Sequence, residues 1–353
     1  MVHNFTAGPS IMPKGVMTEA AQGLLNYNNT GLSLLEVSHR SKAFVAVIDE
    51  ATALVKELTQ LGDDYEVCFL QGGATQQFMQ VPLHFLAPES AASYIDTGVW
   101  SSKAIKQAKQ YGGVHVVASS EASNYNFIPK THHNFEGDSY LHITTNNTIF
   151  GSQYHHIPTT NLPLIADMSS DIFSRPTNYA AYDLIYAGAQ KNMGTAGTTL
   201  VIVKKDFLQK TVRPIPSILD YREHIKNNSL LNTPPVFAIY VALLTLRYIK
   251  QKTIATLGIN NAAKANLMYN TIDALPIFKG TIAHQDRSQM NACFVMENET
   301  LEAEFLKLCE AENMVGIKGH RLSGGFRVSM YNALPIESVV AITDLMKHFA
   351  SKK

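Results

Sequence analysis

The stretch from residue 162 to residue 204 reads LPLIADMSSDIFSRPTNYAAYDLIYAGAQKNMGTAGTTLVIVK and contains three short apolar runs. Each run is rich in aliphatic or aromatic residues and is bounded by Gly, Pro, Asn or Ser, as expected for buried strands. Asp167 follows the first run, and Gln190 and Lys191 follow the second. One acid and one lysine are therefore expected at the ends of neighbouring strands, where open α/β sheets bind ligands. The runs are residues 164–166, 184–188 and 199–203.

A carboxylate and an amine on opposite sides of a small crevice suit pyridoxal phosphate. That cofactor bonds to a lysine and uses an acid to keep its pyridine nitrogen protonated. The small residues of Gly194-Thr195-Ala196-Gly197 after the lysine allow a bulky group to approach the backbone. An ordinary salt bridge between Asp167 and Lys191 would give the same pattern. This stretch alone leaves both interpretations open.

The composition excludes several classes of protein. The chain has 353 residues, of which 16% are charged, with 29 basic residues against 29 acidic ones. This length predicts one large domain and a smaller one. Nucleic acid is not expected as a partner, because phosphate backbones call for an excess of basic residues.

Cysteine use and hydropathy predict a cytoplasmic protein without a membrane span. Cys68, Cys293 and Cys309 are far apart and odd in number, so neither a disulfide framework nor a zinc site follows. The N-terminus has no signal-peptide pattern, and the apolar run at residues 236–246 is too short to cross a bilayer.

The rest of the chain alternates between strand and helix patterns, which indicates an α/β fold. The residues from Phe44 to Leu61 form one apolar stripe at helical spacing, and Gly62 is placed to end that helix. Further strands are expected at residues 65–70, 93–96, 114–118, 140–144, 293–296 and 326–330. Further helices are expected at residues 16–25, 103–111, 234–249, 262–274, 301–311 and 336–349.

Three other strand ends carry candidate cofactor contacts. Gly72-Gly73-Ala74-Thr75 opens a helix after a strand, where free N–H groups and the helix dipole attract a phosphate. Trp100, the only tryptophan of the sequence, could stack on an aromatic ring, and Thr148 adds a hydroxyl. Each feature alone has an ordinary explanation, as a tight turn, a packing residue or a polar loop.

Basic residues gather in two places that could hold an anionic substrate. One is the pair His39-Arg40 before a helix, and the other contains His320, Arg321 and Arg327 in the C-terminal part. An isolated His-Arg pair is more often solvated. The pairs His132-His133 and His155-His156 lack metal-ligand spacing, so no metal site is expected. Together, the residues at the strand ends suit a phosphorylated aromatic aldehyde as cofactor, and the basic clusters suit a substrate with two anionic groups.

The whole chain resembles the phosphoserine aminotransferase family, which belongs to the class V group of fold-type I pyridoxal phosphate enzymes. The order of SHR, GAQKN, NTPP and GHR is specific to that resemblance. The matching segments are NFTAGPSIMP, EVSHRSKAF, QGGATQQF, DTGVWSSKAIKQAK, NNTIFG, ADMSSDIFSRP, YDLIYAGAQKNMGTAG, NTPPVFAIY and GHRLSGGFRVSMYNALP.

The resemblance implies a large domain with a mixed, mostly parallel sheet between helices and a smaller α/β C-terminal domain. We place the N-terminal segment that packs on the small domain at residues 1–15, the large cofactor-binding domain at 16–258 and the small domain at 259–353. A homodimer with active sites shared between its subunits is also implied.

Site roles follow from the resemblance position by position. Lys191 would carry the cofactor and move a proton, and Asp167 would keep the pyridine nitrogen protonated. Arg327 would bind the substrate carboxylate. Trp100 would stack on the cofactor ring, and Thr148 would bond to the hydroxyl side of that ring. The cofactor phosphate would be held by Ala74, Thr75 and Gln190, together with Asn232 and Thr233 of the other subunit. The phosphate of phosphoserine or the distal carboxylate of glutamate would meet His39, Arg40, His320 and Arg321.

The implied reaction is reversible ping-pong amino transfer from L-glutamate to 3-phosphohydroxypyruvate, which gives O-phospho-L-serine and 2-oxoglutarate for serine biosynthesis. A phosphorylated four-carbon 2-oxo acid of vitamin B6 synthesis fits the same pocket. The alternatives are an alanine–glyoxylate or serine–pyruvate aminotransferase, a cysteine desulfurase, and a non-catalytic binding protein on this fold. Two positions depart from part of the family: Ala74-Thr75 stands where several relatives carry Arg-Gly, and Phe150 stands where some relatives have an acid in the same loop.

Overall fold

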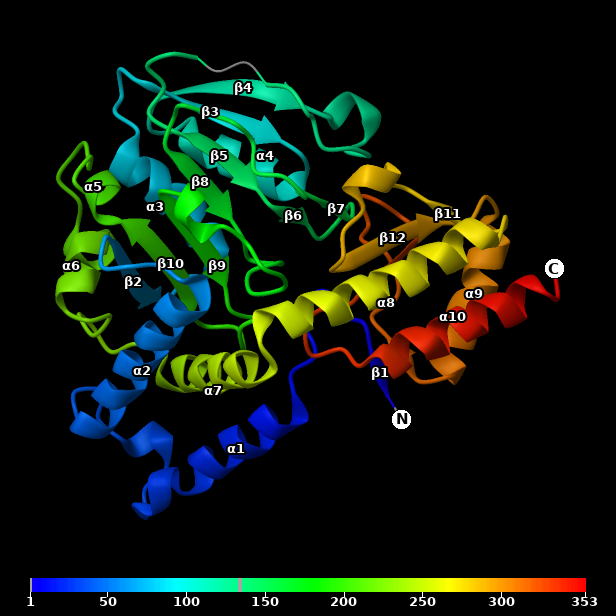
Figure 1. Ribbon diagram of the computed structural model, residues 1–353, viewed down its shortest axis with the longest axis horizontal. Coiled ribbons are helices and arrows are strands. Elements are labelled where there is room, and N and C mark those ends of the chain that lie inside the picture. The colour runs from blue at the N-terminus through cyan, green and yellow to red at the C-terminus, as the bar shows by residue number, and fades with distance from the viewer. Residues whose placement is uncertain (1, 133–134) are drawn as a thin grey trace.

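A twisted seven-stranded sheet organises the part of the chain that this computed structural model describes, residues 2–132 and 135–353 (Figure 1). Its order is β2-β10-β9-β8-β5-β3-β4. β10 is antiparallel to both its neighbours, and the other adjacent pairs are parallel. This confirms the predicted mixed, mostly parallel sheet. The strands are β2 (Tyr65–Leu70), β3 (Ala91–Asp96), β4 (Gly113–Ser119), β5 (Leu141–Thr144), β8 (Leu164–Asp167), β9 (Leu184–Gly188) and β10 (Thr199–Lys204).

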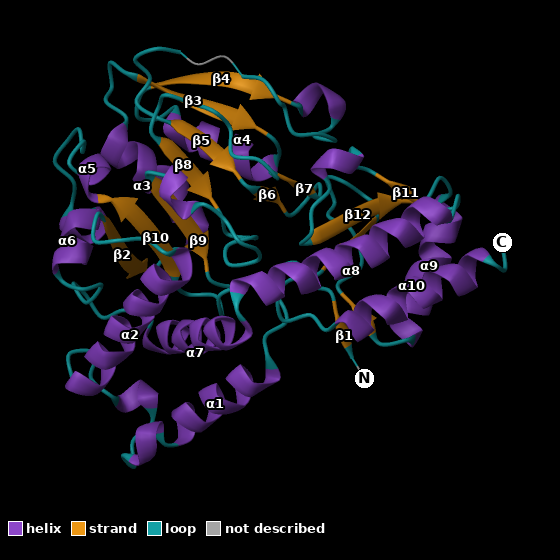
Figure 2. Cartoon of the chain, viewed as in Figure 1, coloured by secondary structure: helices purple, strands orange, loops and turns teal. Residues whose placement is uncertain are grey.

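Helices cover both faces of this sheet, as Figure 2 shows. α3 (Gly73–Phe85) and α4 (Val99–Ala108) cover one face, and α2 (Lys42–Thr59) and α7 (Val236–Lys252) cover the other. Successive strand residues point to opposite faces, so Ile165 packs with the first pair and Ala166 with the second. Strands buried on both faces are apolar throughout, which explains the uninterrupted runs of the sequence. The remaining elements of this part are α1 (Lys14–Leu25), β6 (Asn146–Asn147), β7 (Ser152–Gln153), α5 (Lys205–Leu208) and α6 (Tyr221–Lys226).

The C-terminal residues form a second layer around the antiparallel sheet β11-β12-β14. Phe294, Phe305 and Phe326 pack together in its core. Phe5 is buried in the same core, because β1 pairs in parallel with β13. The elements are β1 (His3–Asn4), α8 (Ile254–Ala274), β11 (Lys279–Gly280), β12 (Asn291–Val295), α9 (Glu299–Ala311), β13 (Met314–Val315), β14 (Phe326–Ser329) and α10 (Ile336–Ala350).

Several expected boundaries were wrong, by two residues at the start of α7 and by more at the start of α8. α2 ends at Thr59, and the next residue, Gln60, adopts the left-handed conformation with φ 57°, so Gly62 is not the terminator. α4 begins at Val99, which places Trp100 inside its first turn. α8 begins at Ile254, eight residues early, because the Thr253 hydroxyl accepts a hydrogen bond from the Thr256 N–H. The proposed domain boundary at residues 258 and 259 therefore lies within α8, and the division into domains remains a proposal.

None of the helices in the described ranges is both long enough and apolar enough to cross a membrane.

Replacing Gln60 with glycine should stabilise the protein. Gln60 is exposed and left-handed, a conformation in which a side chain costs about 1 kcal/mol and glycine costs nothing. We expect the free energy of unfolding of Gln60→Gly to rise by about 0.5–1 kcal/mol in urea titrations. The matched control is Gln107→Gly inside α4, which should lose about 1 kcal/mol. A loss of stability in both variants would contradict this account of the helix end.

Candidate active site

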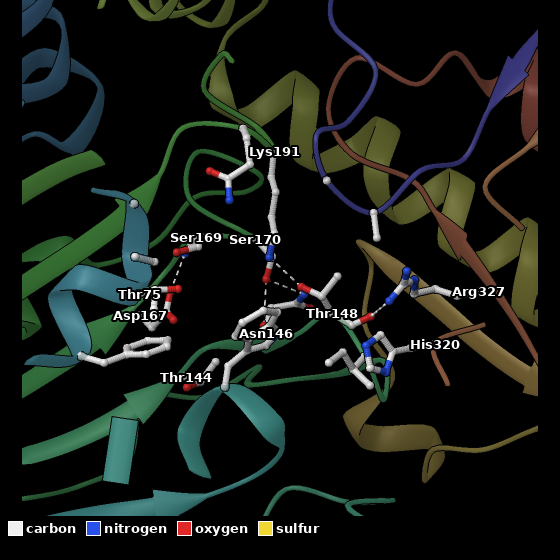
Figure 3. A pocket seen from close by; sticks show the side chains of 18 residues that line it. Thr75, Thr144, Asn146, Thr148, Asp167, Ser169, Ser170, Lys191, His320 and Arg327 are labelled. Atoms are coloured by element: carbon white, nitrogen blue, oxygen red, sulfur yellow. Dashed lines mark hydrogen bonds between the residues drawn. The ribbon is translucent and has the colours of Figure 1, made fainter. Parts of the chain in front are cut away.

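A cavity of about 310 Å³ opens where the carboxyl ends of β5 and β8 meet the first turns of α3 and α4. Lys191 reaches into it between Asp167 and Thr75 on one side and Arg327 and His320 on the other (Figure 3). The lining residues are Ala7, Gly8, Gly73, Ala74, Thr75, Phe78, Trp100, Thr144, Asn146, Thr148, Ile149, Asp167, Ser169, Ser170, Gln190, Lys191, His320 and Arg327.

Lys191 lies just beyond β9 and forms no ion pair with Asp167 among the described residues. Its Nζ donates a hydrogen bond to the Thr148 hydroxyl at 2.7 Å. Burial lowers the pKa of the Lys191 amine to about 8, the Asp167 carboxylate opposes this change, and the Arg327 charge adds to it. Near neutral pH a larger fraction of this amine is therefore neutral and nucleophilic than for a solvent-exposed lysine.

Asp167 ends β8 and is 5% exposed. Burial raises the pKa of its carboxyl group, while hydrogen bonds from Ser169 and the charge of Lys191 favour the ionised form. One of these bonds runs from the Ser169 N–H to Oδ1 at 2.9 Å. A buried carboxylate held this way can accept a hydrogen bond from a protonated ring nitrogen. The positive charge of that nitrogen would offset the loss of hydration that the carboxylate suffers on burial.

The start of α3 forms an anion site at the same edge. Gly72 and Gly73 have φ of 100° and 67°, so the chain turns left-handed before the helix. A Cβ on Gly72 would lie 1.7 Å from the Gln76 side chain, so a glycine is needed there. Ala74 and Thr75 occupy the first turn, whose N–H groups have no partner within the helix. The geometry suits a phosphate.

Trp100 forms another wall of the cavity. Ser101 fixes the helix start beneath it, because its hydroxyl accepts hydrogen bonds from the Thr97 and Gly98 N–H groups and donates to Asp96. The Lys103 ammonium lies 4.6 Å from the centroid of the indole, whose own Nε1 is buried without a hydrogen-bond partner. The indole thus has a free polar edge and a broad face beside the cavity.

The side opposite Asp167 carries positive charge. Arg327 lies on β14, and its Nη1 donates a hydrogen bond to the Thr148 carbonyl at 3.3 Å while its Nε is buried without a partner. His320 also lines the cavity, and burial together with Arg327 and Arg321 lowers its pKa. Guanidinium donors left free in a cavity suit a carboxylate.

Five of the expected residues do not line this cavity. His39 and Arg40 precede α2, and Asn232 and Thr233 precede α7. Arg321 is exposed on the loop before β14. The structure therefore brings nine of the fourteen expected residues together in this cavity, and the other five do not line it.

Sequence reasoning missed the N-terminal wall and the polar base of the site. Ala7 and Gly8 line the cavity because Ser10 is bonded to the lysine loop, its N–H to the Gln190 carbonyl and its hydroxyl to the Lys191 carbonyl. The base contains three further polar side chains, those of Asn146, Ser169 and Ser170. The two serines directly follow Asp167, and that adjacency was the available signal.

The departure at Phe150 has a structural explanation. Its ring packs at 4.9 Å from that of Tyr125, and a Cβ on Gly98 would touch it. Phe150 thus supports the turn before α4 and does not line the cavity. Phe150 is not among the hydrogen-bond or charge partners of Lys191 and Asp167.

Pyridoxal phosphate fits these residues on the chemistry of the donors. Lys191 offers an amine for the covalent bond, and Asp167 offers an acid at the far side of the cavity. The first turn of α3 offers N–H groups for the phosphate, and Trp100 offers an aromatic face. Arg327, which lines the opposite side of the cavity, remains for the substrate.

Comparisons with known proteins give the class. The family described as aminotransferase class-V matches residues 2–342, so the chain belongs to this family of pyridoxal phosphate-dependent aminotransferases. Within it, the chain is 52% identical to the phosphoserine aminotransferase of Flavobacterium psychrophilum over 99% of both proteins.

Solved structures agree with this assignment. The phosphoserine aminotransferase of Bacillus circulans subsp. alkalophilus superposes with a TM-score of 0.97 at 43% identity, over 100% of this chain and 99% of the other. A pyridoxal phosphate-bound phosphoserine aminotransferase from Trichomonas vaginalis has a TM-score of 0.93 at 36% identity, over 98% of this chain and 100% of the other. The phosphoserine aminotransferase resemblance of the sequence is thereby confirmed.

The rate of cofactor uptake should report the protonation of Lys191. Cofactor-free protein reacts through the neutral amine, so uptake of pyridoxal phosphate should rise with pH through about 8 and level off above it. Asp167→Asn removes the carboxylate that raises this pKa, and the profile should move to lower pH. Stopped-flow absorbance between about pH 6 and 10 measures both profiles. The control is Glu66→Gln near the opposite end of β2, and an unmoved profile in Asp167→Asn would refute the coupling.

Proposed function

We propose that this enzyme transfers the amino group of L-glutamate to 3-phosphohydroxypyruvate reversibly, with O-phospho-L-serine and 2-oxoglutarate as products. The observation that carries the proposal is the guanidinium of Arg327, which faces Lys191 from the side opposite Asp167 with the imidazole of His320 beside it. Relatives about half identical over the whole chain bear the name of this activity. Glutamate and phosphoserine share an α-carboxylate and a distal anion, and such substrates need two sets of cations.

Each side of the cavity has its own role in the proposed reaction. The bound cofactor supplies an electron-withdrawing ring that takes up the electron pair released when the substrate loses its α-proton. Asp167 keeps that ring protonated, and Trp100 restricts its tilt. Arg327 orients the α-carboxylate through two parallel hydrogen bonds. Lys191, whose pKa lies near 8, accepts the α-proton at Nζ and returns it to the cofactor side.

One pocket must accept two different distal anions in alternate half-reactions. A guanidinium binds carboxylate and phosphate with the same planar pair of donors, which favours arginine over lysine in this place. A phosphorylated four-carbon 2-oxo acid has the same two charged ends. We include that substrate of vitamin B6 synthesis in the proposal.

The proposal includes a homodimer with shared sites. His39, Arg40, Asn232 and Thr233 are absent from the cavity of their own subunit, and a second copy could supply them. Large apolar side chains are exposed around α1, which supports a subunit interface there. They are Met17, Leu25, Leu32 and Leu35.

A cysteine desulfurase is less well supported, because burial raises the pKa of all three thiols to about 12. An alanine–glyoxylate enzyme is less well supported, because its substrates carry an α-carboxylate for Arg327 but no distal anion for a second set of basic residues. We also place the protein in the cytoplasm, supported by three unpaired, buried cysteines.

Arg327→Lys tests the substrate side. A lysine keeps the charge but loses the paired donors, so kcat/KM with glutamate should fall by about 30- to 1,000-fold, or ~2–4 kcal/mol. The cofactor band near about 410 nm should remain, since Arg327 is not among the proposed cofactor contacts. Coupled assays of 2-oxoglutarate release provide the measurement, with Arg222→Lys in α6 as the control. Near-normal turnover with glutamate would place the carboxylate site elsewhere.

Mixed dimers test the shared site. Lys191→Ala and Arg40→Ala should each be inactive alone, but random re-pairing should restore roughly a quarter of wild-type activity. In half of the pairs, one site then combines an intact Lys191 with the partner's intact Arg40. Activity after mixing is the measurement, and differently tagged subunits recovered through both tags confirm re-pairing. No recovery would mean that Arg40 acts within its own subunit.

A further inference from the structure

Lys264 is a buried lysine without a counterion. It lies in the middle of α8 and is 2% exposed. Its Nζ donates hydrogen bonds to three backbone carbonyls, those of Met330 at 2.9 Å, Tyr331 at 2.8 Å and Leu334 at 3.1 Å. No carboxylate pairs with it in the described ranges. An ammonium has three donors, so this cage uses all of them.

The burial of this ammonium is unfavourable, so its presence in the core calls for an explanation. Removing an ammonium from water costs several kcal/mol, and an apolar side chain of the same length would fill the space at lower cost. Burial accordingly lowers the pKa of Lys264 to about 7. The ammonium does supply donors to residues 330–334, a segment outside the helices and strands. The Tyr331 carbonyl also accepts from the Leu334 N–H at 2.9 Å, whereas the Met330 and Leu334 carbonyls have no other donor among the described residues.

That segment connects the two sides of the active site. It directly follows β14, which carries Arg327. The Asn332 N–H donates to Asn192 Oδ1 at 3.0 Å, and Asn192 is the neighbour of Lys191. The Tyr331 hydroxyl donates to the carbonyl of Ala7, a wall of the cavity, at 2.8 Å.

Asn332 is held on its other side as well. Its Nδ2 donates to the Phe173 carbonyl at 3.1 Å, and its Oδ1 accepts from Asn261 of α8 at 2.8 Å. Asn192 in turn donates to the carbonyl of Ser170 in the base of the site, at 3.3 Å. Asn332 therefore bonds to α8 on one side and, through Phe173 and Asn192, to the segments that follow Asp167 and Lys191 on the other.

We propose that Lys264 is a positioning residue for amino transfer: its ammonium fixes residues 330–334 and, through Asn332 and Asn192, sets the place of Lys191 relative to Arg327. The distance between the proton-transferring amine and the carboxylate-binding arginine is then determined by a group that touches neither substrate nor cofactor. The proposal rests on Lys191 and Arg327 acting in one reaction.

Lys264→Met keeps the length and volume of the side chain and removes all three donors. We expect kcat with glutamate to fall by about 10- to 100-fold, as for a displacement of about 1 Å at a reacting group. KM should change by less than about threefold, because pairing with β12 still holds Arg327. Steady-state kinetics with glutamate separate the two constants, and a rise in KM at constant kcat would overturn the proposal.

A double-mutant cycle separates positioning from general stability. Asn192→Ala cuts the link between Asn332 and the lysine loop and should lower kcat by itself. If Lys264 acts through this link, the double variant should be hardly slower than Lys264→Met alone. Fold losses in kcat that multiply would overturn the proposal, because the two residues would then act independently.

The control for stability is Val55→Ala, a change at a buried position of α2 in the other core, which does not include residues 330–334. It should lower the thermal midpoint without changing kcat. If Lys264→Met does not fold, Lys264→Gln keeps amide donors without the charge, and an intermediate loss of kcat is expected in the same cycle. Wild-type kcat in Lys264→Gln would overturn the proposal. Wild-type protein that is inactive with glutamate would instead contradict the proposed substrates.

Discussion

The desolvation of the Lys191 amine is the constraint on which the site depends. In water this amine would be fully protonated near neutral pH, and at the end of β9 its pKa is lowered to about 8. Asp167 and Arg327 act on it with opposite signs, so neither an ion pair nor a bare apolar pocket results. The amine bonds to a neutral hydroxyl, that of Thr148. Because its pKa lies near 8, Lys191 can change its protonation state during a reaction.

The sheet supplies this environment because it is buried on both faces. Residues that alternate along β8 serve two cores, and the polar residues appear only where the strand ends. Asp167 and Lys191 therefore meet at one edge with apolar layers above and below them. The first turns of α3 and α4 lie at the same edge and bring a helix N-terminus and Trp100. The fold brings the site residues together because the strands that carry them end at the same edge of the sheet.

Sequence reasoning recovered the parts of the structure that local pattern encodes. Residues 65–70 and 184–188 were predicted with the bounds that the structure has, because each run is apolar and its ends are polar or glycine. Gln60 was missed, since tertiary packing holds a non-glycine residue in a left-handed conformation. The Ala7 wall and the Asn332 contacts depend on pairing between segments more than 130 residues apart, which periodicity does not reveal.

The small domain does more than carry Arg327. Asn146, in the base of the site, donates to Asn291 of β12 at 2.9 Å, and Asn332 bonds to Asn192 on the other side of the lysine loop. Two buried polar links thus join the domains on either side of the cavity. Buried hydrogen bonds are costly to break without replacement, so these links hold Arg327 at a fixed place relative to Lys191. Any adaptation to a carboxylate or a phosphate is therefore expected at the exposed loop of Arg321, and not at β14.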